Sequence, residues 1–140
     1  MNQEIIKVLL IKDNEDDHLL INDLLSNLEM LKTSVDWENT YEGGLAAIEK
    51  SQHDVCLVDY SLGEKNGLEL LQTKIVQSCK IPIILLTNED DQKLYMTAIS
   101  LGAADYLHKS EVKSYRLERV IFCAITVSYT HLTLPTNRCV

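Results

Sequence analysis

Polar side chains that could do chemistry together stand at the ends of four short apolar runs of this chain. They are two carboxylates, a hydroxyl and an amine: Asp13, Asp59, Thr87 and Lys109. The carboxyl ends of parallel strands meet at one crevice of an open α/β sheet, which is where such sheets present their chemistry. Asp59 also precedes an irregular loop that reaches Gly67, eight residues later. We therefore expect a site centred on a carboxylate and assisted by the other three groups.

Five apolar runs are the strand candidates that would position these groups, at residues 5–11, 33–37, 54–59, 81–86 and 104–107. The runs are mostly apolar rather than alternately apolar and polar, which is typical of strands covered on both faces. Stretches with helical periodicity separate them, and alternating strands and helices favour a parallel sheet. The predicted fold class is therefore α/β, with a doubly wound five-stranded parallel sheet in a (βα)5 arrangement.

The helices are predicted from apolar residues spaced three or four apart. This pattern is carried by Leu20, Leu24 and Leu28, by Leu68, Leu71 and Ile75, by Leu94, Ala98 and Leu101, and by Leu117, Val120, Ile121 and Ala124. The second helix has the weakest pattern because Gly43 and Gly44 lower helix propensity, but Thr40 can cap it. We expect one helix in each connection.

The composition excludes several classes of protein. A chain of 140 residues is one domain by size, and its 46% hydrophobic and 24% charged residues are those of an ordinary globular protein. The net charge of −8 opposes direct binding to nucleic acid or to a membrane surface. No apolar run approaches the ~20 residues of a membrane span, and no secretion signal is visible, so we expect a cytoplasmic location.

Residues 126–140 depart from the alternation of strands and helices. They are rich in threonine, and Pro135 prevents a helix from continuing through them. The stretch Ser-Tyr-Thr-His-Leu-Thr-Leu-Pro-Thr at 128–136 resembles translated vector sequence. We expect a domain at residues 1–125 and a vector-derived tail at 126–140, with a native linker as the alternative. The four cysteines form no metal-binding cluster, and we expect thiols rather than disulfides.

The polar residues and the motifs around them resemble the receiver domain of two-component response regulators. Tyr106, three residues before Lys109, belongs to the same pattern, and the resemblance spans about residues 4–125. The motifs follow in family order and spacing: Val-Asp-Tyr-Ser-Leu at 58–62, Asn-Gly-Leu-Glu-Leu-Leu at 66–71, Ile-Pro-Ile-Ile-Leu-Leu-Thr at 81–87 and Gly-Ala-Ala-Asp-Tyr-Leu-His-Lys at 102–109. The resemblance implies a flavodoxin-like receiver fold and a role in signal transduction.

The resemblance also implies phosphoryl transfer from a sensor histidine kinase or a phosphotransfer protein to Asp59. That carboxylate would attack phosphorus and form an acyl phosphate. Asp13, Asp59 and the backbone carbonyl of Ser61 would hold Mg²⁺, which prefers oxygen ligands. Lys109 and the Thr87 hydroxyl would bind phosphoryl oxygens. Such a domain catalyses its own phosphorylation and dephosphorylation but is not an enzyme that acts on another substrate.

Thr87 and Tyr106 are, by the same resemblance, the switch residues. Tyr106 would rotate as Thr87 moves, and the face formed by the fourth helix, fifth strand and fifth helix would carry the signal to an output domain or partner. Tyr95 and Arg116 offer contacts on that face, and a homodimer is a further expectation. The alternatives are that Thr87 only caps the next helix and that Tyr106 is a plain core aromatic.

Lys12 departs from the family pattern, because receivers usually carry two adjacent acids where this chain has Lys12-Asp13. An ammonium in place of an acid changes the local charge by two units, so we expect weakened Mg²⁺ binding. The ammonium could instead pair with Asp13 or Asp59 and partly substitute for the cation. The alternative function is a degenerate receiver that binds proteins without phosphorylation. A nucleotide-binding protein is disfavoured because the acidic loop 12–17 would repel phosphate.

Overall fold

The structure, a computed structural model, describes residues 5–13, 15–88 and 92–129. Its central feature is a sheet of five parallel strands in the order β2-β1-β3-β6-β7. The strands are β1 (Ile5–Ile11), β2 (Lys32–Glu38), β3 (Val55–Asp59), β6 (Ile83–Thr87) and β7 (Asp105–His108). The predicted α/β class with a five-stranded parallel sheet is confirmed.

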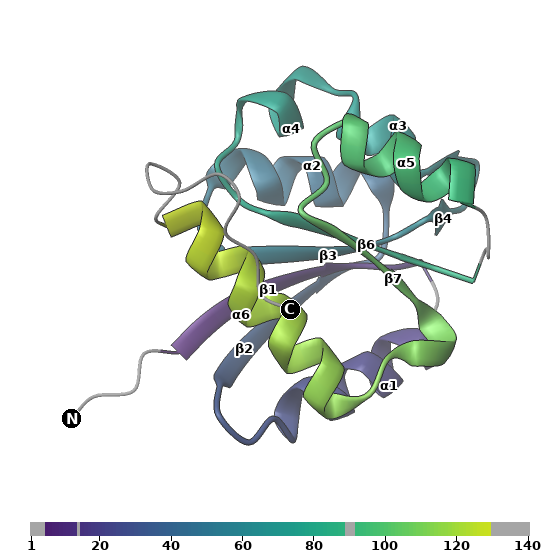
Figure 1. The fold of residues 1–140 in the computed structure, drawn as a ribbon. Helices are drawn as coiled ribbons and strands as arrows, with labels where there is room; N and C mark the ends of the chain where they lie inside the picture. Colours follow the sequence, from purple (N-terminus) through teal and green to yellow (C-terminus); the bar gives the residue numbers. More distant parts are fainter. Residues whose placement is uncertain (1–4, 14, 89–91, 130–140) are drawn as a thin grey trace.

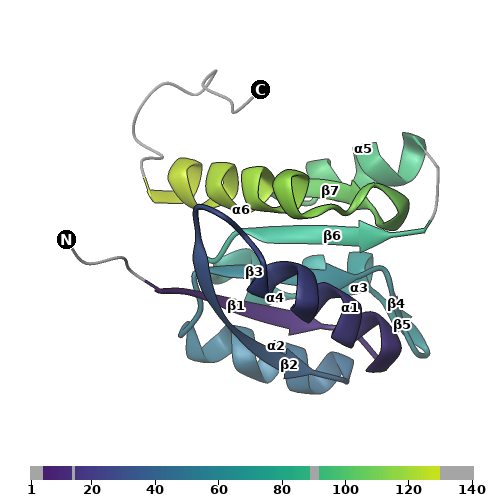
Figure 2. The same cartoon turned by 90° about the horizontal axis from the view of Figure 1, so that it is seen from below.

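Helices cover both faces of this sheet (Figures 1 and 2). One layer consists of α1 (Glu15–Ser26) and α6 (Ser114–Tyr129). The other consists of α2 (Tyr41–Lys50), α3 (Gly67–Leu71), α4 (Lys74–Ser78) and α5 (Gln92–Ser100). A short hairpin of β4 (Ser61–Leu62) and β5 (Lys65–Asn66) follows β3, and the 3-10 helix η1 (Lys109–Glu111) follows β7. The fold is therefore doubly wound.

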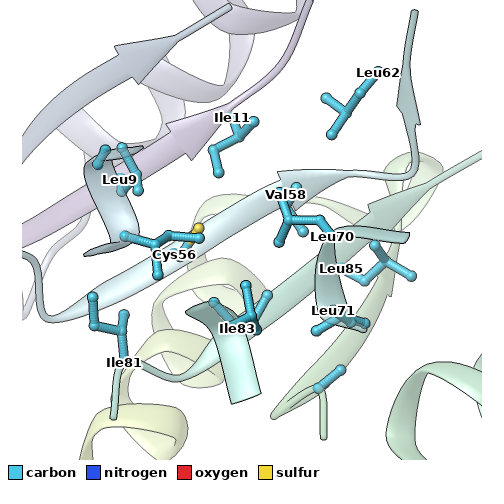
Figure 3. Close-up of a cluster of buried hydrophobic side chains, with 14 of the residues drawn as sticks. Leu9, Ile11, Cys56, Val58, Leu62, Leu70, Leu71, Ile81, Ile83 and Leu85 are labelled. Carbon is cyan, nitrogen blue, oxygen red and sulfur yellow. The ribbon is translucent and has the colours of Figure 1, made fainter. Parts of the chain in front are cut away.

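The core has two apolar layers because successive residues of a strand point to opposite faces of the sheet. Figure 3 shows the layer under α2 to α5, to which the central strands contribute Leu9, Ile11, Cys56, Val58, Ile83 and Leu85. The layer under α1 and α6 receives their neighbours Val8, Leu10, Val55, Leu57, Ile84 and Leu86. All of these side chains are buried, which explains why the runs are apolar throughout.

Strand β6 begins at Ile83, two residues later than the apolar run predicts. Pro82 has no N–H group and cannot donate to a neighbouring strand, so regular pairing starts after it. The Pro82 carbonyl still accepts a hydrogen bond from the Cys56 backbone N–H at 3.0 Å. The apolar run therefore marks buried backbone correctly and overestimates the length of the strand.

Helix α2 begins at the predicted cap. The Thr40 side chain accepts a hydrogen bond from the Gly43 N–H at 2.9 Å. Gly44 has a packing reason, since a Cβ atom there would lie 2.6 Å from Cδ1 of Ile11. The glycine that weakens the helix pattern in the sequence thus allows α2 to lie close against β1.

The third connection holds two short helices, so the prediction of one helix there is wrong. Leu68 and Leu71 lie on α3, whereas Ile75 lies on α4. The break comes at Thr73, whose hydroxyl accepts a hydrogen bond from the Val76 N–H at 3.2 Å and so caps α4. A threonine side chain that bonds to nearby backbone offers an alternative to continuous helix, and the apolar spacing alone does not reveal it.

Helix α6 runs to Tyr129, four residues beyond the expected end of the domain at 125. The tail predicted at 126–140 therefore begins inside this helix, while residues 130–140 lie outside the described part of the chain. Cys56 and Cys79 are free thiols, and burial raises the pKa of the Cys56 thiol. Cys123 is disulfide-bonded, contrary to the prediction of thiols throughout.

A carboxylate ties α6 to the loop between α1 and β2. Glu118 accepts hydrogen bonds through Oε2 from the backbone N–H groups of Met30 at 2.5 Å and Leu31 at 2.7 Å. Two backbone donors that no strand or helix satisfies thereby find a partner. Helix α6 is therefore bonded to the loop that follows α1, in addition to its apolar packing against α1 itself.

Candidate functional site

Three polar residues are buried among those that the structure describes: Lys12, Asp59 and Thr87. Each stands at or directly after the carboxyl end of one of three neighbouring strands, β1, β3 and β6. Buried charges need partners, because removing an unpaired charge from water is costly. Parallel pairing brings the three residues to the same edge of the sheet, where the sequence predicts a site.

The Asp59 carboxylate is the centre of this site. Its Oδ2 atom accepts hydrogen bonds from two ammonium groups, Lys109 Nζ at 3.0 Å and Lys12 Nζ at 3.2 Å. The side chain of Asp59 is 4% exposed, that of Lys109 is 18% exposed and that of Lys12 is fully buried. The structure thus brings together Asp59 and Lys109, and it adds Lys12 on the same carboxylate oxygen.

The backbone of Lys12 is held on both sides by the end of β2. Its N–H donates to the Glu38 carbonyl at 3.1 Å, and its carbonyl accepts from Nε1 of Trp37 at 2.8 Å. These bonds fix the residue directly after β1 and direct its side chain toward the neighbouring β3. Sequence reasoning did not include Trp37 in the site, since a tryptophan in a strand pattern gives no signal of a bond to a residue 25 positions away.

The three predicted Mg²⁺ ligands differ in their surroundings. Asp13 is exposed, Asp59 is buried against two ammonium groups, and Ser61 is exposed at the first residue of β4. The described residues contain no group of three or more acidic, histidine or cysteine side chains that could hold a metal. Mg²⁺ requires several oxygen ligands and retained waters. With a buried ammonium on the Asp59 carboxylate, these residues do not fit a tight Mg²⁺ site.

The predicted switch residues lie on adjacent strands. Thr87 is the last residue of β6 and pairs with His108, while Tyr106 of β7 pairs with Leu85. The ring of Tyr106 meets the ring of Tyr95 on α5 edge to face, with centroids 5.5 Å apart. Such aromatic pairs favour one relative orientation. Tyr106 is partly buried, packs against the apolar layer under α2 to α5, and joins β7 to α5 through Tyr95.

A cavity of about 220 Å³ opens beside the two lysines. Its lining combines polar with apolar side chains, namely Lys12, Lys109, Asn88, Ser110, Leu20, Ile21 and Val112. His108, which is not among the predicted site residues, contacts both loops beside this cavity. Its Nε2 lies 3.0 Å from the Asn88 carbonyl, and its Nδ1 accepts a hydrogen bond from the Ser110 N–H at 3.1 Å. The loops after β6 and β7 are thereby joined.

The loop after Asp59 is shaped by glycine and by a capping box. A Cβ atom on Gly67 would lie 2.5 Å from Cδ1 of Leu85 and 3.2 Å from the Asp59 carbonyl oxygen, so this position requires glycine. Asn66 and Glu69 form a capping box that starts α3, with bonds of 2.9 and 3.0 Å. The spacing from Asp59 to Gly67 that the sequence shows is therefore the length of a closed hairpin loop.

A larger cavity, of about 470 Å³, lies away from this site. It is lined by Ser51, His53, Asp54, Ser78, Cys79, Lys80, Ile81, Pro82 and Ile125. Asp54 and Pro82 precede β3 and β6, so the cavity is at the amino end of the sheet. None of the predicted site residues lines it, and size alone does not identify the chemistry of a pocket.

The sequence profile of the response regulator receiver domain matches residues 8–121. The chain belongs to this family. Receiver domains are signalling modules of two-component systems, and they generally bind Mg²⁺ at the acidic phosphorylation site. In the described residues, no helix combines the length and apolarity needed to cross a membrane.

Among curated relatives of this receiver is the transcriptional regulatory protein QseB of Haemophilus influenzae. It is 34% identical over 104 residues, which are 74% of this chain and 46% of the relative. The transcriptional regulatory protein RprY of Bacteroides fragilis is 27% identical over 121 residues, 84% of this chain and 50% of the relative. A protein-glutamate methylesterase of Treponema denticola is 30% identical over 108 residues, 76% of this chain and 29% of the relative. The chain spans half or less of these relatives' length.

Solved structures show the same fold. A response regulator receiver domain protein from Clostridium thermocellum has a TM-score of 0.78 at 24% identity, covering 92% of this chain and all of that chain. The signal receiver domain of a Luxo repressor protein from Vibrio parahaemolyticus has a TM-score of 0.79 at 19% identity, covering 96% of this chain and all of that chain. At these identities the likeness concerns the fold alone.

Proposed function

We propose that this receiver accepts a phosphoryl group on Asp59 from a histidine kinase or a phosphotransfer protein, in the cytoplasm. The observation that carries the proposal is the buried Asp59 carboxylate at the carboxyl end of the central strand β3, with Lys109 Nζ 3.0 Å from its Oδ2. A carboxylate is a nucleophile that forms covalent phosphoryl intermediates. An ammonium at that distance can bind the charge that develops on the phosphoryl oxygens.

The transfer step follows from this geometry. A carboxylate oxygen of Asp59 attacks phosphorus, and the bond from phosphorus to the imidazole nitrogen of the donor breaks. The nitrogen keeps the electron pair, and Asp59 becomes an acyl phosphate. Lys109 binds a phosphoryl oxygen, and the Thr87 hydroxyl, at the end of the adjacent strand, binds another. The protein contributes mainly position and electrostatic stabilisation, which is what phosphoryl transfer requires.

We propose that Mg²⁺ binds only weakly at this site. Asp13, Asp59 and the Ser61 carbonyl are the groups that would hold it, and the Lys12 ammonium on Asp59 opposes it by charge repulsion. The transfer step above therefore uses the chain's own cations.

We propose that the face formed by α5, β7 and α6 carries the signal to the output. The negatively charged oxygens of the acyl phosphate would draw the Thr87 hydroxyl toward the phosphoryl group, and Tyr106 would turn against Tyr95. The two helices that border this face, α5 and α6, carry several exposed large side chains: Tyr95, Met96, Ile99, Tyr115 and Phe122. We propose that an output domain, a partner protein or a second copy of the chain binds there.

Intact-mass spectrometry of the full chain after incubation with acetyl phosphate tests the phosphoacceptor. Asp59→Asn should abolish the added phosphoryl mass, because an amide oxygen is not a comparable nucleophile. Asp54→Asn is the matched control: it makes the same change just before the other end of β3 and should label like the unmodified chain. Persistent labelling of Asp59→Asn would assign the phosphate to another residue.

The second candidate function is a degenerate receiver, which binds proteins without being phosphorylated. It predicts that the unmodified chain takes no phosphoryl group. The complete burial of Lys12 on the acceptor carboxylate is the observation in its favour, since two ammonium groups already share that oxygen. Absence of labelling with acetyl phosphate, both with and without Mg²⁺, would establish this reading.

A further inference from the structure

We propose that the Lys12 ammonium is a built-in counter-cation of the Asp59 acceptor, so that this receiver takes a phosphoryl group without a divalent metal. The inference rests on the proposed phosphoacceptor role of Asp59. It assigns a function to the residue that departs most from the family pattern. It also accounts for a site whose residues do not fit a tight Mg²⁺ complex.

The burial of Lys12 shows that its ammonium belongs to the site. Lysine is almost never fully buried unless it is paired, because its charge prefers water. Lys12 is fully buried, and its Nζ lies 3.2 Å from Oδ2 of Asp59. Its backbone is anchored by the Trp37 and Glu38 bonds at the end of β2. The side chain therefore has a fixed place on the acceptor and does not extend into solvent.

Among the site residues that the structure describes, the charges balance without a metal. Lys12 and Lys109 carry one positive charge each, and Asp13 and Asp59 carry one negative charge each. With an acid at position 12, the same four positions would have two net negative charges, which one divalent cation neutralises. An incoming phosphoryl group needs this neutralisation because its oxygens and the acceptor carboxylate repel each other. Lys12 supplies it within the chain.

Both ammonium groups contact one oxygen of the Asp59 carboxylate, so its second oxygen is the one proposed to attack phosphorus. Lys12 and Lys109 contact the same atom, Oδ2 of Asp59, so attack through Oδ1 breaks neither contact. The two lysines also line the same cavity of about 220 Å³. With acetyl phosphate, Oδ1 bonds to phosphorus, the bond from phosphorus to the acetate oxygen breaks, and acetate leaves with the electron pair. No proton transfer or redox partner is needed.

The test compares labelling by acetyl phosphate in excess chelator with labelling in millimolar Mg²⁺, using the full chain and intact-mass spectrometry. The unmodified chain should label at rates within about threefold of each other in the two conditions. Lys12→Asp, which restores an acid, should label at least about tenfold faster with Mg²⁺ than in chelator. Lys12→Met, which removes the ammonium alone, should label about tenfold more slowly than the unmodified chain in chelator.

Lys32→Asp is the matched control for charge, since Lys32 is exposed at the amino end of β2 and the substitution changes net charge by the same amount as Lys12→Asp. Its labelling should show no new dependence on Mg²⁺. Circular dichroism verifies that each variant is folded. If the Lys12 variants do not fold, the unmodified chain alone decides the question through its labelling in chelator.

The outcomes separate this inference from the proposed function. Labelling of the unmodified chain in Mg²⁺ but not in chelator would overturn the inference and leave Asp59 as the acceptor. Equal labelling of Lys12→Met and the unmodified chain in chelator would also overturn it. No labelling in either condition would overturn the proposed function itself. Trp37 fluorescence provides a second readout, because its indole is bonded to the Lys12 carbonyl: Mg²⁺ should change it in Lys12→Asp and leave it unchanged in the unmodified chain.

Discussion

The interiors of β1, β3 and β6 and the carboxyl ends of the same three strands are equally buried but chemically opposite. Leu10, Leu57 and Ile84 in the interiors are fully buried and apolar. Two or three residues farther along, the buried side chains are Lys12, Asp59 and Thr87. Apolar burial stabilises the fold, whereas a buried ion pair contributes little net stability because both charges lose water. The contrast agrees with the proposal that the interiors maintain the fold and that the ends serve the chemistry of Asp59.

The largest expected effect on stability comes from an interior position. Leu57→Ala should lower the free energy of unfolding by about 3 kcal/mol, because it leaves a cavity in the layer under α1 and α6. Urea unfolding followed by circular dichroism measures this. The folded fraction should still be labelled by acetyl phosphate, whereas Asp59→Asn, two residues along the same strand, should lose labelling entirely. If Leu57→Ala lowered the free energy of unfolding by less than Asp59→Asn does, the contrast between the strand interiors and the strand ends would be wrong.

A double-mutant cycle tests the ion pair at the strand ends. Asp59→Asn removes the carboxylate partner of a buried ammonium, and we expect it to cost about 2 kcal/mol of folding free energy. Lys12→Met should cost less, because Asp59 keeps Lys109 at 3.0 Å. The double variant should be more stable than the sum of the two changes implies, with a coupling of about 2 kcal/mol. Strictly additive effects in urea unfolding would show that the two groups do not interact.

The affinity for Mg²⁺ measures the difference between an ammonium and an acid at position 12. Lys12→Asp should tighten Mg²⁺ at least about tenfold, which corresponds to ~1.4 kcal/mol, because the mutant exchanges a repelling charge for an attracting one. Calorimetry follows the titration of both proteins, with Lys32→Asp as the control for net charge. Equal metal affinities in Lys12→Asp and the unmodified chain would mean that the ammonium does not act on the metal site.

The smallest effect is expected at the rim of the site. Asn66→Ala removes one bond of the capping box that starts α3, and it should cost about 1 kcal/mol of folding free energy. Glu69→Gln retains an acceptor for the Asn66 N–H and should cost less. Thermal unfolding of the two variants measures the difference. A larger loss for Glu69→Gln would show that charge near the helix start matters more than the cap.

The sheet could be predicted from the sequence because its signals are local. Continuous apolar runs mark strands that are buried on both faces, and the polar residues at their ends mark the edge where the site lies. The break at Thr73 has no such signal, since a hydroxyl that caps a second helix leaves the apolar spacing unchanged. Strand β6 begins later than its apolar run because Ile81 is already buried, whereas regular pairing starts only after Pro82.

The site was predicted less completely than the sheet. Asp59 and Lys109 follow strands, which gives each a positional signal, and the structure places them 3.0 Å apart. The sequence left two orientations open for Lys12, into the crevice or into solvent, because a flexible four-carbon side chain has no preferred direction that a sequence pattern can reveal. The Trp37 and His108 contacts join residues distant in the chain, and no local pattern predicts such bonds.

The Glu118 carboxylate determines how α6 is turned about its own axis. Apolar side chains such as Leu117 and Ile121 would tolerate a small rotation of the helix, since their contacts have little directionality. Hydrogen bonds to the Met30 and Leu31 N–H groups have a narrow range of angles and do not. The outward direction of Phe122, one turn after Glu118, is therefore set by the α1–β2 loop. A substitution in that loop would change the direction of the side chains that α6 presents to a partner, although none of those side chains is itself substituted.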